Sequence, residues 1–431
     1  MNPTSVGPMG NTTDGNLKTA FITQWFPPEP TPIPLFIAQS LQRRGHDVEV
    51  LTGVPNYPTG IVTDGYKAWK PRSELVEGVS VRRSPLYASH DASPLKRILN
   101  YVSWAVSTTL FRSNQLRKAD VTLVFSSPAT AAFPAMVMRR LTRTPYVLFI
   151  QDLWPDSVTA AGFIGNRRVG GLVHRILSTF TNWTYKSAAH IAVLSPGMIS
   201  ELERRGVKSQ KLSLVYNWAN ESQQSVSPGC AESRARFDVP EDAFVVSYAG
   251  NQGAAQGLDV VVRAANRLSA HSEIMFLFFG DGMERKKLEK LAADLGCKNI
   301  HFVGTIPQAD MPFAQAASDV QLVSLVDNAL FEITMPSKVQ GIFASGSPVI
   351  AVAAGDVARA VEDSGAGWAV PPGDDEGLSL RILEACALES QSLKAMGLAG
   401  LSYYREHMSE AIGGDRLDEI LRWAAGTRGR R

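Results

Sequence analysis

The segment Met335-Pro336-Ser337-Lys338 opens an apolar stretch that is expected to form a helix as far as Ala344. Proline suits the first turn of a helix. A lysine suits it less well, because the positive end of the helix dipole disfavours a cation. An anion at the same place would remove this conflict, since the first amides of a helix and a lysine side chain can together hold a phosphate group. We therefore expect Lys338 to bind a phosphate, with a solvated surface lysine as the alternative.

Three further turns in the second half of the chain follow apolar runs with the character of β-strands. They are Gly250-Asn251-Gln252-Gly253, Gly280-Asp281-Gly282 and Gly304-Thr305-Ile306-Pro307. Glycine allows backbone amides to approach an anion closely. These turns are therefore candidate contacts for a phosphate, although each could be an ordinary tight turn.

In the first half of the chain, the segment Gln151-Asp152-Leu153-Trp154-Pro155-Asp156 directly follows the apolar run 146–150. Its position predicts that the carboxylate of Asp152 contacts a hydroxyl group of a second substrate. Asp156 could equally cap a helix. The proline-rich loop 26–30 follows the first expected strand and should face the same way.

Short apolar runs alternate with longer amphipathic runs along most of the chain, which indicates parallel sheets with helices on both faces. The expected strands are 19–23, 48–51, 121–125, 146–150, 191–194, 212–216, 244–248, 274–279, 300–303, 320–325 and 349–352. The expected helices include 34–44, 131–141, 169–186, 258–268, 284–295 and 415–425. A polar stretch at 220–232 reads as a linker. The pattern predicts two doubly wound α/β domains, with ligands in a cleft between the carboxyl ends of their strands.

The expected domain bounds follow from this pattern. Residues 1–17 form a flexible tail, 18–218 a first Rossmann-like domain, 219–235 the linker and 236–405 a second Rossmann-like domain. Residues 406–431 form a C-terminal helix that packs back on the first domain and ends in a basic tail.

Composition excludes several classes of protein. The 431 residues are 45% hydrophobic and 19% charged, which is typical of globular domains and not of disordered chains. Lysine and arginine total 43 against 41 acidic residues, so nothing favours a nucleic-acid partner. The three cysteines are scattered, and no histidine pair has the spacing of metal ligands, so we expect no metal and a reducing cytoplasm. We also expect no signal peptide and no membrane-spanning segment.

The segment 95–111 combines apolar residues with basic ones at its start, Lys96 and Arg97. This pattern is compatible with a helix that lies on a membrane surface, with Leu99, Val102 and Trp104 inserted. A helix that packs into the core is the alternative.

Taken together, the motifs resemble glycosyltransferase family 4, which has the two-domain GT-B fold. The resemblance covers about residues 18–423 and is nearest to the bacterial branch that includes L-fucosamine transferases of surface polysaccharide synthesis. It is carried by the order and spacing of Gly45-His46-Asp47-Val48, 151–156, 248–253, Gln256-Gly257-Leu258, 279–282, Phe302-Val303-Gly304, Pro336-Ser337-Lys338 and 344–350.

The resemblance implies transfer of a sugar from a nucleotide donor with retention at the anomeric carbon and no metal cofactor. The donor would lie on the second domain, and the leaving phosphate itself would take the proton of the acceptor. The predicted catalytic residues are Asp152, Glu332 and Lys338. The predicted donor contacts are Gly250, Asn251, Gln252, Gly253, Gln256, Gly280, Asp281, Thr305, Ile306, Pro336, Ser337, Lys338 and Gln340.

The chain departs from the family pattern at two places. Asn251 and Gln256 stand where many members carry an arginine and a lysine that hold the diphosphate. Many members also carry two glutamates, eight positions apart, around the helix that opens at Pro336. Here those positions fall on Ile333 and Gly341, so that the neighbouring Glu332 and Gln340 are the candidates to replace them.

The sequence therefore predicts a cytoplasmic glycosyltransferase, peripheral on the inner face of the membrane, with a UDP-sugar donor. The donor sugar would be an N-acetylated amino sugar and the acceptor a lipid-linked molecule or a glycan. Two alternatives remain. One is a UDP-N-acetylglucosamine 2-epimerase, which shares the fold but needs acid–base residues in place of an acceptor channel. The other is a non-catalytic subunit that only binds a nucleotide or a partner.

Overall fold

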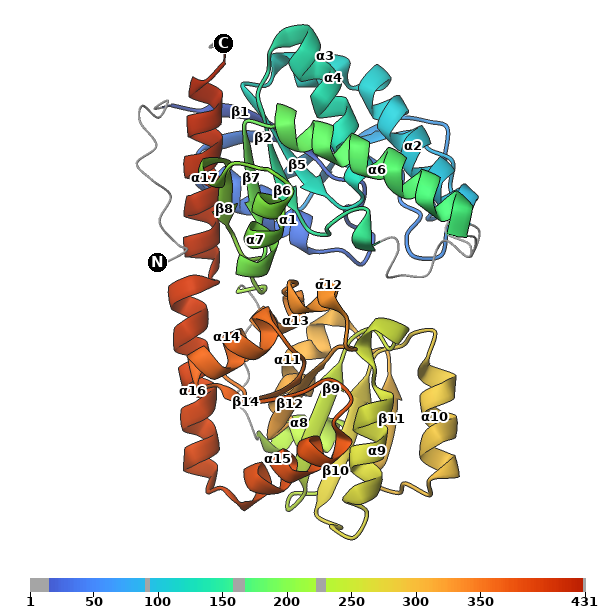
Figure 1. Cartoon of the computed structure of the whole chain (residues 1–431), viewed down its shortest axis with the longest axis vertical. Coiled ribbons are helices and arrows are strands. Elements are labelled where there is room, and N and C mark those ends of the chain that lie inside the picture. The colour runs from blue at the N-terminus through green and yellow to red at the C-terminus, as the bar shows by residue number, and fades with distance from the viewer. Residues whose placement is uncertain (1–14, 90–93, 158–166, 222–229, 429–431) are drawn as a thin grey trace. The chain divides into compact units, whose positions relative to one another are not determined.

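The computed structural model describes residues 15–89, 94–157, 167–221 and 230–428. They fold into two compact α/β units, as the sequence pattern predicts. The first unit comprises residues 1–216 and 413–431, and the second comprises residues 217–412. Each unit is a mostly parallel sheet with helices on both faces (Figure 1).

The sheet of the first unit has eight strands in the order β3-β4-β2-β1-β5-β6-β7-β8. All pairs are parallel except β3 with β4. The strands are β1 (Leu17–Ile22), β2 (His46–Gly53), β3 (Arg72–Val76), β4 (Val79–Ser84), β5 (Val121–Ser126), β6 (Tyr146–Ile150), β7 (His190–Val193) and β8 (Leu212–Leu214). The helices are α1 (Ile33–Arg43), α2 (Pro94–Phe111), α3 (Ser113–Lys118), α4 (Ala132–Thr142), α6 (Arg167–Ser187), α7 (Pro196–Arg204) and α17 (Glu410–Gly426), with short 3₁₀ turns at η1 (Ala129–Ala131) and η2 (Ser209–Lys211).

The sheet of the second unit has six strands in the order β11-β10-β9-β12-β13-β14, all parallel. The strands are β9 (Phe244–Ala249), β10 (Ile274–Phe279), β11 (Ile300–Gly304), β12 (Val320–Ser324), β13 (Val349–Val352) and β14 (Gly367–Val370). The helices are α8 (Ala231–Arg236), α9 (Asp259–Arg267), α10 (Arg285–Asp294), α11 (Met311–Ala316), α12 (Ala329–Glu332), α13 (Ser337–Ser345), α14 (Asp356–Ser364), α15 (Asp375–Ala387) and α16 (Ser390–His407), with 3₁₀ turns at η3 (Ala254–Gln256) and η4 (Gln308–Asp310).

Both sheets have a switch point, where consecutive connections leave in opposite directions along the sheet. In the first unit it lies between β1 and β5, and in the second between β9 and β12. Parallel strands present all their carboxyl ends at one edge, so the loops that follow these strands gather there. This edge is where the sequence motifs lie in each unit.

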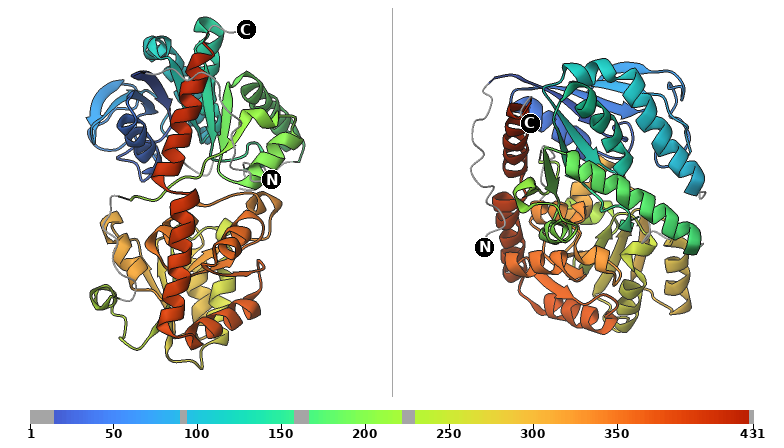
Figure 2. Two further views of the ribbon diagram at one scale, coloured as in Figure 1. Left: turned by 90° about the vertical axis from the view of Figure 1, so that its left-hand side faces the viewer. Right: turned by 45° about the horizontal axis from the view of Figure 1, so that its top comes forward.

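The helix α17 returns the chain to the first unit, where ion pairs hold it against β2 (Figure 2). Asp418 Oδ1 lies 2.6 Å from Nε2 of the buried His46, and Asp415 pairs with Arg44 at 2.8 Å. Gly414 allows this close approach, because a Cβ atom there would lie 2.4 Å from the hydroxyl of Ser40. The last helix therefore belongs structurally to the first unit.

The antiparallel strands β3 and β4 were not expected from the sequence. β3 is polar and largely exposed, so it lacks the apolar run that marks the other strands. β4 carries Arg82 and the fully buried Arg83, whose guanidinium pairs with Glu74 of β3 and donates to the carbonyl of Pro27. The charge that obscured this strand in the sequence is compensated by Glu74 of the paired strand and by the carbonyl of Pro27, which lies far away along the chain.

One buried histidine makes the stability of the first unit depend on pH. His190 is 1% exposed, its Nε2 lies 2.8 Å from the hydroxyl of Ser213, and its ring packs edge-on against Trp423 of α17. Burial, together with a smaller effect of the nearby charge of Lys211, lowers the pKa of His190 to about 4. The side chain is therefore neutral in the folded protein.

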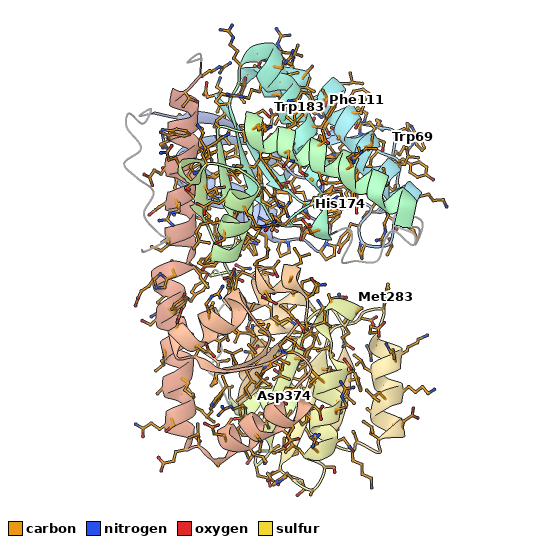
Figure 3. All side chains as sticks on the ribbon, in the orientation of Figure 1. Trp69, Phe111, His174, Trp183, Met283 and Asp374 are labelled. Carbon is orange, nitrogen blue, oxygen red and sulfur yellow. The ribbon has the colours of Figure 1, made fainter. Side chains whose placement is uncertain are left out.

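We predict that the free energy of unfolding falls as the pH falls from about 6.5 to about 4, because only the unfolded chain protonates His190 in this range. The full contribution is about 3 kcal/mol. Urea unfolding at pH 7 and pH 4.5 should show a smaller acid-induced loss in His190→Gln than in the parent protein. The exposed His174, labelled in Figure 3, provides the control, since His174→Gln should behave like the parent. Equal acid sensitivity of all three proteins would contradict the prediction.

Candidate functional site

The glycine turns at the carboxyl edge of the second sheet pack backbone against backbone. The amide of Gly250 donates to Phe279 at 3.0 Å, and the amide of Gln252 donates to the carbonyl of Asp281 at 2.8 Å. A Cβ atom on Gly280 would lie 2.1 Å from the carbonyl oxygen of Gly250, and one on Gly282 would lie 2.3 Å from that of Gln252. No larger residue fits at these two positions without separating the turns.

The third glycine turn joins the same row of loops. The amide of Gly280 donates to the carbonyl of Gly304 at 2.7 Å, so the turn that precedes Thr305 and Ile306 lies directly beside 280–282. Thr305 is exposed and Ile306 is partly buried against a small apolar cluster. The structure thus brings together the three turns that the sequence analysis selected separately.

Lys338 lies next to the first of these turns. Its Nζ is 3.3 Å from the centre of the Tyr248 ring, and a Cβ atom on Gly250 would lie 3.2 Å from the same nitrogen. The hydroxyl of Tyr248 donates to the carbonyl of Asn251 at 2.6 Å, which ties the ring to the turn. Lys338 is therefore positioned by a cation–π contact with Tyr248, a residue of β9, next to the turn 250–253 that follows this strand.

The charge of Lys338 is not balanced by a carboxylate. Within the residues that the structure describes, no acidic side chain forms an ion pair with it. Desolvation lowers the pKa of Lys338 well below its usual value. A lysine that is partly withdrawn from water beside the Gly250 turn is suited to bind an anion, whose arrival would favour the charged form of the lysine.

The neutral residues Asn251 and Gln256 stabilise the turn through hydrogen bonds within it. The Asn251 amide donates to Oε1 of Gln256 at 3.3 Å, and the backbone amide of Gly253 donates to the same oxygen at 3.1 Å. Asp281 is used in a similar way, because its Oδ1 accepts from the amide of Gly282 at 2.8 Å. These side chains hold the loops in place, and Asn251 and Asp281 also remain exposed.

Two predicted donor contacts have buried side chains. Gln252 is 0% exposed and donates to the carbonyl of Gly280 at 3.1 Å. Gln340 is also 0% exposed, and its amide nitrogen faces the carbonyls of Pro336 and Ser337 at 2.8 and 3.1 Å in its own helix. Both residues thus support the backbone of the site in this structure. A direct contact of Gln340 with a ligand stays a prediction.

Glu332 lies on the other side of the switch point, at the end of α12. It lines a shallow hollow together with Leu325, Val326, Asp327, Asn328, Phe331, Ala354 and Pro372. Asn328 begins α12 by accepting from the amide of Leu330 at 2.9 Å. Gly355 must remain glycine to let the loop after β13 approach, since a Cβ atom there would lie 1.9 Å from the carbonyl of Glu332.

In the first unit, Asp152 follows β6 as predicted and its side chain is exposed. Its Oδ2 accepts from the hydroxyl of Ser127 at 2.8 Å, and Ser127 follows the neighbouring strand β5. The carboxylate of Asp156 pairs with Arg205, and the residues that it could cap in a helix lie outside the described ones. Of the two carboxylates in this motif, Asp152 is thus the more exposed one, and it lies at the carboxyl edge of the sheet.

Sequence reasoning missed three aromatic residues near this motif. Trp25, Tyr57 and Tyr101 form a cluster with Trp154, although they come from three other segments. A signal was present for two of them, since Trp25 and Tyr57 lie in polar or proline-rich loops directly after expected strands. Tyr101 gave none, because it lies within the apolar pattern of a helix.

No group of three His, Cys, Asp or Glu side chains close enough to hold a metal ion occurs in the described ranges. The candidate phosphate-binding features of the second unit are the glycine turns, the start of α13 and Lys338. An anion can be held there by oriented amides and one cation.

Comparison with known proteins identifies the family. Residues 35–218 match the family described as a glycosyl transferase 4-like domain, and residues 231–400 match glycosyl transferases group 1. The chain belongs to the glycosyltransferases with the GT-B fold. The Escherichia coli K12 protein WcaI, named as a glycosyl transferase of colanic acid biosynthesis, is 29% identical over 73% of this chain and 77% of its own length. WbjE of Pseudomonas aeruginosa, named as a glycosyltransferase, is 26% identical over 76% of this chain and 80% of its own.

Solved GT-B structures share the fold over nearly the whole chain. HepE of Anabaena, determined in complex with UDP and glucose, superposes with a TM-score of 0.69 at 16% identity and covers 94% of this chain and 99% of its own. WaaG, a glycosyltransferase involved in lipopolysaccharide biosynthesis, superposes with a TM-score of 0.68 at 17% identity over 94% of this chain and 99% of its own. At this level of identity the likeness establishes the fold, which confirms the predicted GT-B architecture.

We predict that Lys338→Met weakens the binding of UDP about 10–100-fold, because a hydrogen bond to a charged group contributes about 1.5–3 kcal/mol. Isothermal titration with UDP measures the change. Lys394→Met, which removes an exposed lysine from α16, should bind UDP like the parent protein. Since desolvation lowers the pKa of Lys338, binding should also weaken as the pH rises, and at a lower pH than an ordinary lysine would cause, and Lys338→Arg should reduce this pH dependence. Unchanged affinity in Lys338→Met would refute the assignment.

Proposed function

We propose that this glycosyltransferase transfers a sugar from a UDP-sugar to a lipid-linked or glycan acceptor during synthesis of a surface polysaccharide, with retention at the anomeric carbon and without a metal cofactor. The observation that carries the proposal is the partly buried, unbalanced charge of Lys338 beside the glycine turns. That arrangement suits a diphosphate. The names of WcaI and WbjE and the UDP complexes of HepE support the reaction class and the nucleotide.

In the proposed reaction the bond between the anomeric carbon and the diphosphate breaks, and a bond forms to the oxygen of an acceptor hydroxyl. The acceptor proton passes to the leaving phosphate, so that no protein base is needed. Negative charge grows on the diphosphate as the bond breaks. Lys338 and the amides at the start of α13 would stabilise this charge.

Two carboxylates have proposed roles with the substrates. Glu332, which is exposed at the end of α12, would contact the transferred sugar. Asp152 would accept a hydrogen bond from the acceptor hydroxyl and so orient it, while Ser127 holds the carboxylate in place. An N-acetylated amino sugar as the donor sugar follows from the resemblance to L-fucosamine transferases and is part of the proposal.

The test is release of UDP from a panel of UDP-sugars in the presence of extracted lipid acceptors. We expect release that depends on acceptor for at least one donor, and a product of retained configuration by NMR. Asp152→Asn should lower acceptor-dependent release about 10–100-fold while leaving UDP binding unchanged. UDP binding without any release would favour the non-catalytic alternative, and interconversion of UDP-N-acetylglucosamine with its 2-epimer would favour the epimerase.

We further propose that the helical layer around α2 docks on a membrane surface where a lipid-linked acceptor resides. In the described residues no helix has both the length and the apolar character needed to cross a bilayer. The outer face of α2 nevertheless exposes Leu99, Val102, Val106, Leu110 and Phe111, and α6 exposes Ile176 and Trp183; Figure 3 labels Phe111 and Trp183.

The charge of this layer complements an anionic surface. α2, α3, α4 and α6 contain no acidic residue, and their basic residues are Lys96, Arg97, Arg117, Lys118, Arg139, Arg140, Arg167, Arg168, Arg175 and Lys186. The expectation that Trp104 inserts into the membrane is wrong, because its side chain is 0% exposed and lies on the inner face of α2. A membrane-surface helix and a core-packing helix were the two alternatives for this segment. α2 has the features of both, because one face packs into the core and the other exposes apolar side chains.

We predict that the protein sediments with vesicles of phosphatidylglycerol and phosphatidylcholine at low salt and less at high salt. Leu110 is 70% exposed, so Leu110→Asp should reduce vesicle binding at least several-fold without unfolding the protein. Leu380→Asp removes a leucine that is 60% exposed in the second unit and should have no effect. Absence of salt-sensitive sedimentation in the parent protein would exclude this mode of docking.

A further inference from the structure

Four aromatic side chains from separate segments meet at the carboxyl edge of the first sheet. The rings of Trp25 and Tyr57 are 4.8 Å apart between centroids, Trp25 and Tyr101 are 6.3 Å apart, and Tyr101 and Trp154 are 6.2 Å apart. Trp25 follows β1, Tyr57 follows β2, Trp154 follows β6, and Tyr101 lies in α2. We call these four residues the aromatic cluster.

All four rings of the aromatic cluster are partly exposed. This differs from the aromatic residues inside the sheet, such as Phe21, Phe149 and Tyr146, which are 0% exposed. The cluster surrounds the switch point of the sheet, between β1 and β5, where α/β sheets bind ligands. Partly exposed rings at such a place offer flat apolar surface to a ligand.

A chain of buried amides fixes the segments that carry three of the rings. Gln24 Nε2 donates to Asn100 Oδ1 at 2.6 Å, and Asn100 Nδ2 donates to Asn56 Oδ1 at 3.1 Å. Each amide residue is at most 3% exposed and immediately precedes an aromatic one: Trp25 follows Gln24, Tyr57 follows Asn56, and Tyr101 follows Asn100. The hydrogen bonds between these amides therefore set the spacing of the rings. The three segments are joined by the amides and do not depend on ring packing to stay together.

A buried carboxylate adds a second tie between two of the loops. Glu29 is 5% exposed, and it accepts from the amide of Phe26 at 3.0 Å and from the amides of Asn56 and Tyr57 at 2.9 Å each. Burial raises the pKa of Glu29 to about 7, while the three amides and Arg83 lower it. The loops after β1 and β2 are thus held in one arrangement before any ligand binds.

Polar groups lie at the border of the aromatic cluster. Desolvation raises the pKa values of Tyr57 and Tyr101, the charge of Arg97 lowers them, and the charge of Asp152 raises them. Asp152 lies two residues before Trp154, and Arg97 lies one helical turn before Tyr101 on α2. Aromatic ring faces with a carboxylate and a guanidinium nearby combine the two features that a sugar requires: ring faces for its C–H groups and partners for its hydroxyls.

We propose that the aromatic cluster binds a pyranose ring of the acceptor between Tyr101 and Trp154, whose ring planes are inclined at 64° to each other. The apolar C–H face of the sugar stacks on one of these rings, the other ring flanks the sugar, and a hydroxyl reaches Asp152. The inference rests on the proposed function, because it makes the acceptor a molecule that presents a sugar ring next to the reacting hydroxyl. It adds that recognition of this ring resides in residues of the first unit alone. Binding of the ring therefore requires neither donor nor turnover.

The test uses saturation-transfer NMR on the full chain, without nucleotide, with methyl glycosides of glucose, galactose, mannose and N-acetylglucosamine as probes at millimolar concentration. We expect at least one probe to receive saturation mainly at the C–H protons of one ring face. Tyr101→Leu, which retains apolar volume but lacks a π-face, and Trp154→Leu should each reduce this signal at least fivefold. Tyr101→Phe should retain it, because the ring and not the hydroxyl makes the contact.

Phe111→Ala is the matched control. Phe111 lies on the same helix as Tyr101, is 53% exposed and belongs to no part of the aromatic cluster, so its loss should leave the signal unchanged (Figure 3). No saturation of any probe, equal signals in Tyr101→Leu and the parent, or equal loss in Phe111→Ala would overturn the proposal. Thermal melting of each variant verifies that it is folded.

The two proposals can fail separately. If donor assays show no transfer but the pyranosides bind with the expected variant pattern, the proposed function fails and the sugar site stands. If transfer to a lipid-linked acceptor occurs and Tyr101→Leu leaves the KM for acceptor unchanged, the sugar site fails and the proposed function stands. A selective rise in that KM, with UDP binding unchanged, is the result that we expect.

Discussion

Lys338 places a positive charge against the ring of Tyr248, and the described part of the chain supplies no carboxylate to balance it. The surrounding loops are arranged as this charge requires. Gly250 leaves room beside the ammonium group, Gly280 and Gly282 let the next turn pack against the first, and Gly304 extends the row. The donor side of the second unit is thus one cation together with a set of closely packed backbone amides.

This arrangement explains how the site could work with Asn251 and Gln256 in place of cations. Two more positive charges in the same turn would repel Lys338, whereas the neutral pair closes the turn through Gln256 Oε1. The structure places Lys338 in the first turn of α13, next to the loop after β9. Under the proposed function, Lys338 supplies the positive charge that a cation in that loop would otherwise supply.

In the first unit the structural requirement is different. Several loops at the carboxyl edge of the sheet are held in fixed positions, although the space between them is not filled by side chains. Buried side-chain amides and the carboxylate of Glu29 hold these loops by hydrogen bonds. The aromatic residues of the same loops therefore remain partly exposed. α2 contributes to both sides of this unit. Its inner face carries Asn100 and Trp104 into the core, and its outer face exposes a stripe of leucine and valine.

Much of the fold could be predicted from sequence because it depends on local pattern. The strands 274–279 and 349–352 were predicted with the bounds that the structure has, since each is a short apolar run between turn residues. Glycine turns, Lys338 and Asp152 could also be selected, because their residue types are unusual for their places along the chain. Such signals are contained within a few consecutive residues.

Tertiary structure alone decided the features that depend on distant partners. The polar strands β3 and β4 form because Glu74 and Pro27 compensate the charge of the buried Arg83. Gln252 and Gln340 look like ligand contacts in sequence but are buried against backbone carbonyls. Trp25, Tyr57, Tyr101 and Trp154 become neighbours only when parallel strands bring their carboxyl ends to one edge. The sequence by itself determined which residues could do chemistry, and the sheet order determined which of them meet, because contacts between segments far apart in the chain leave no periodicity in either one.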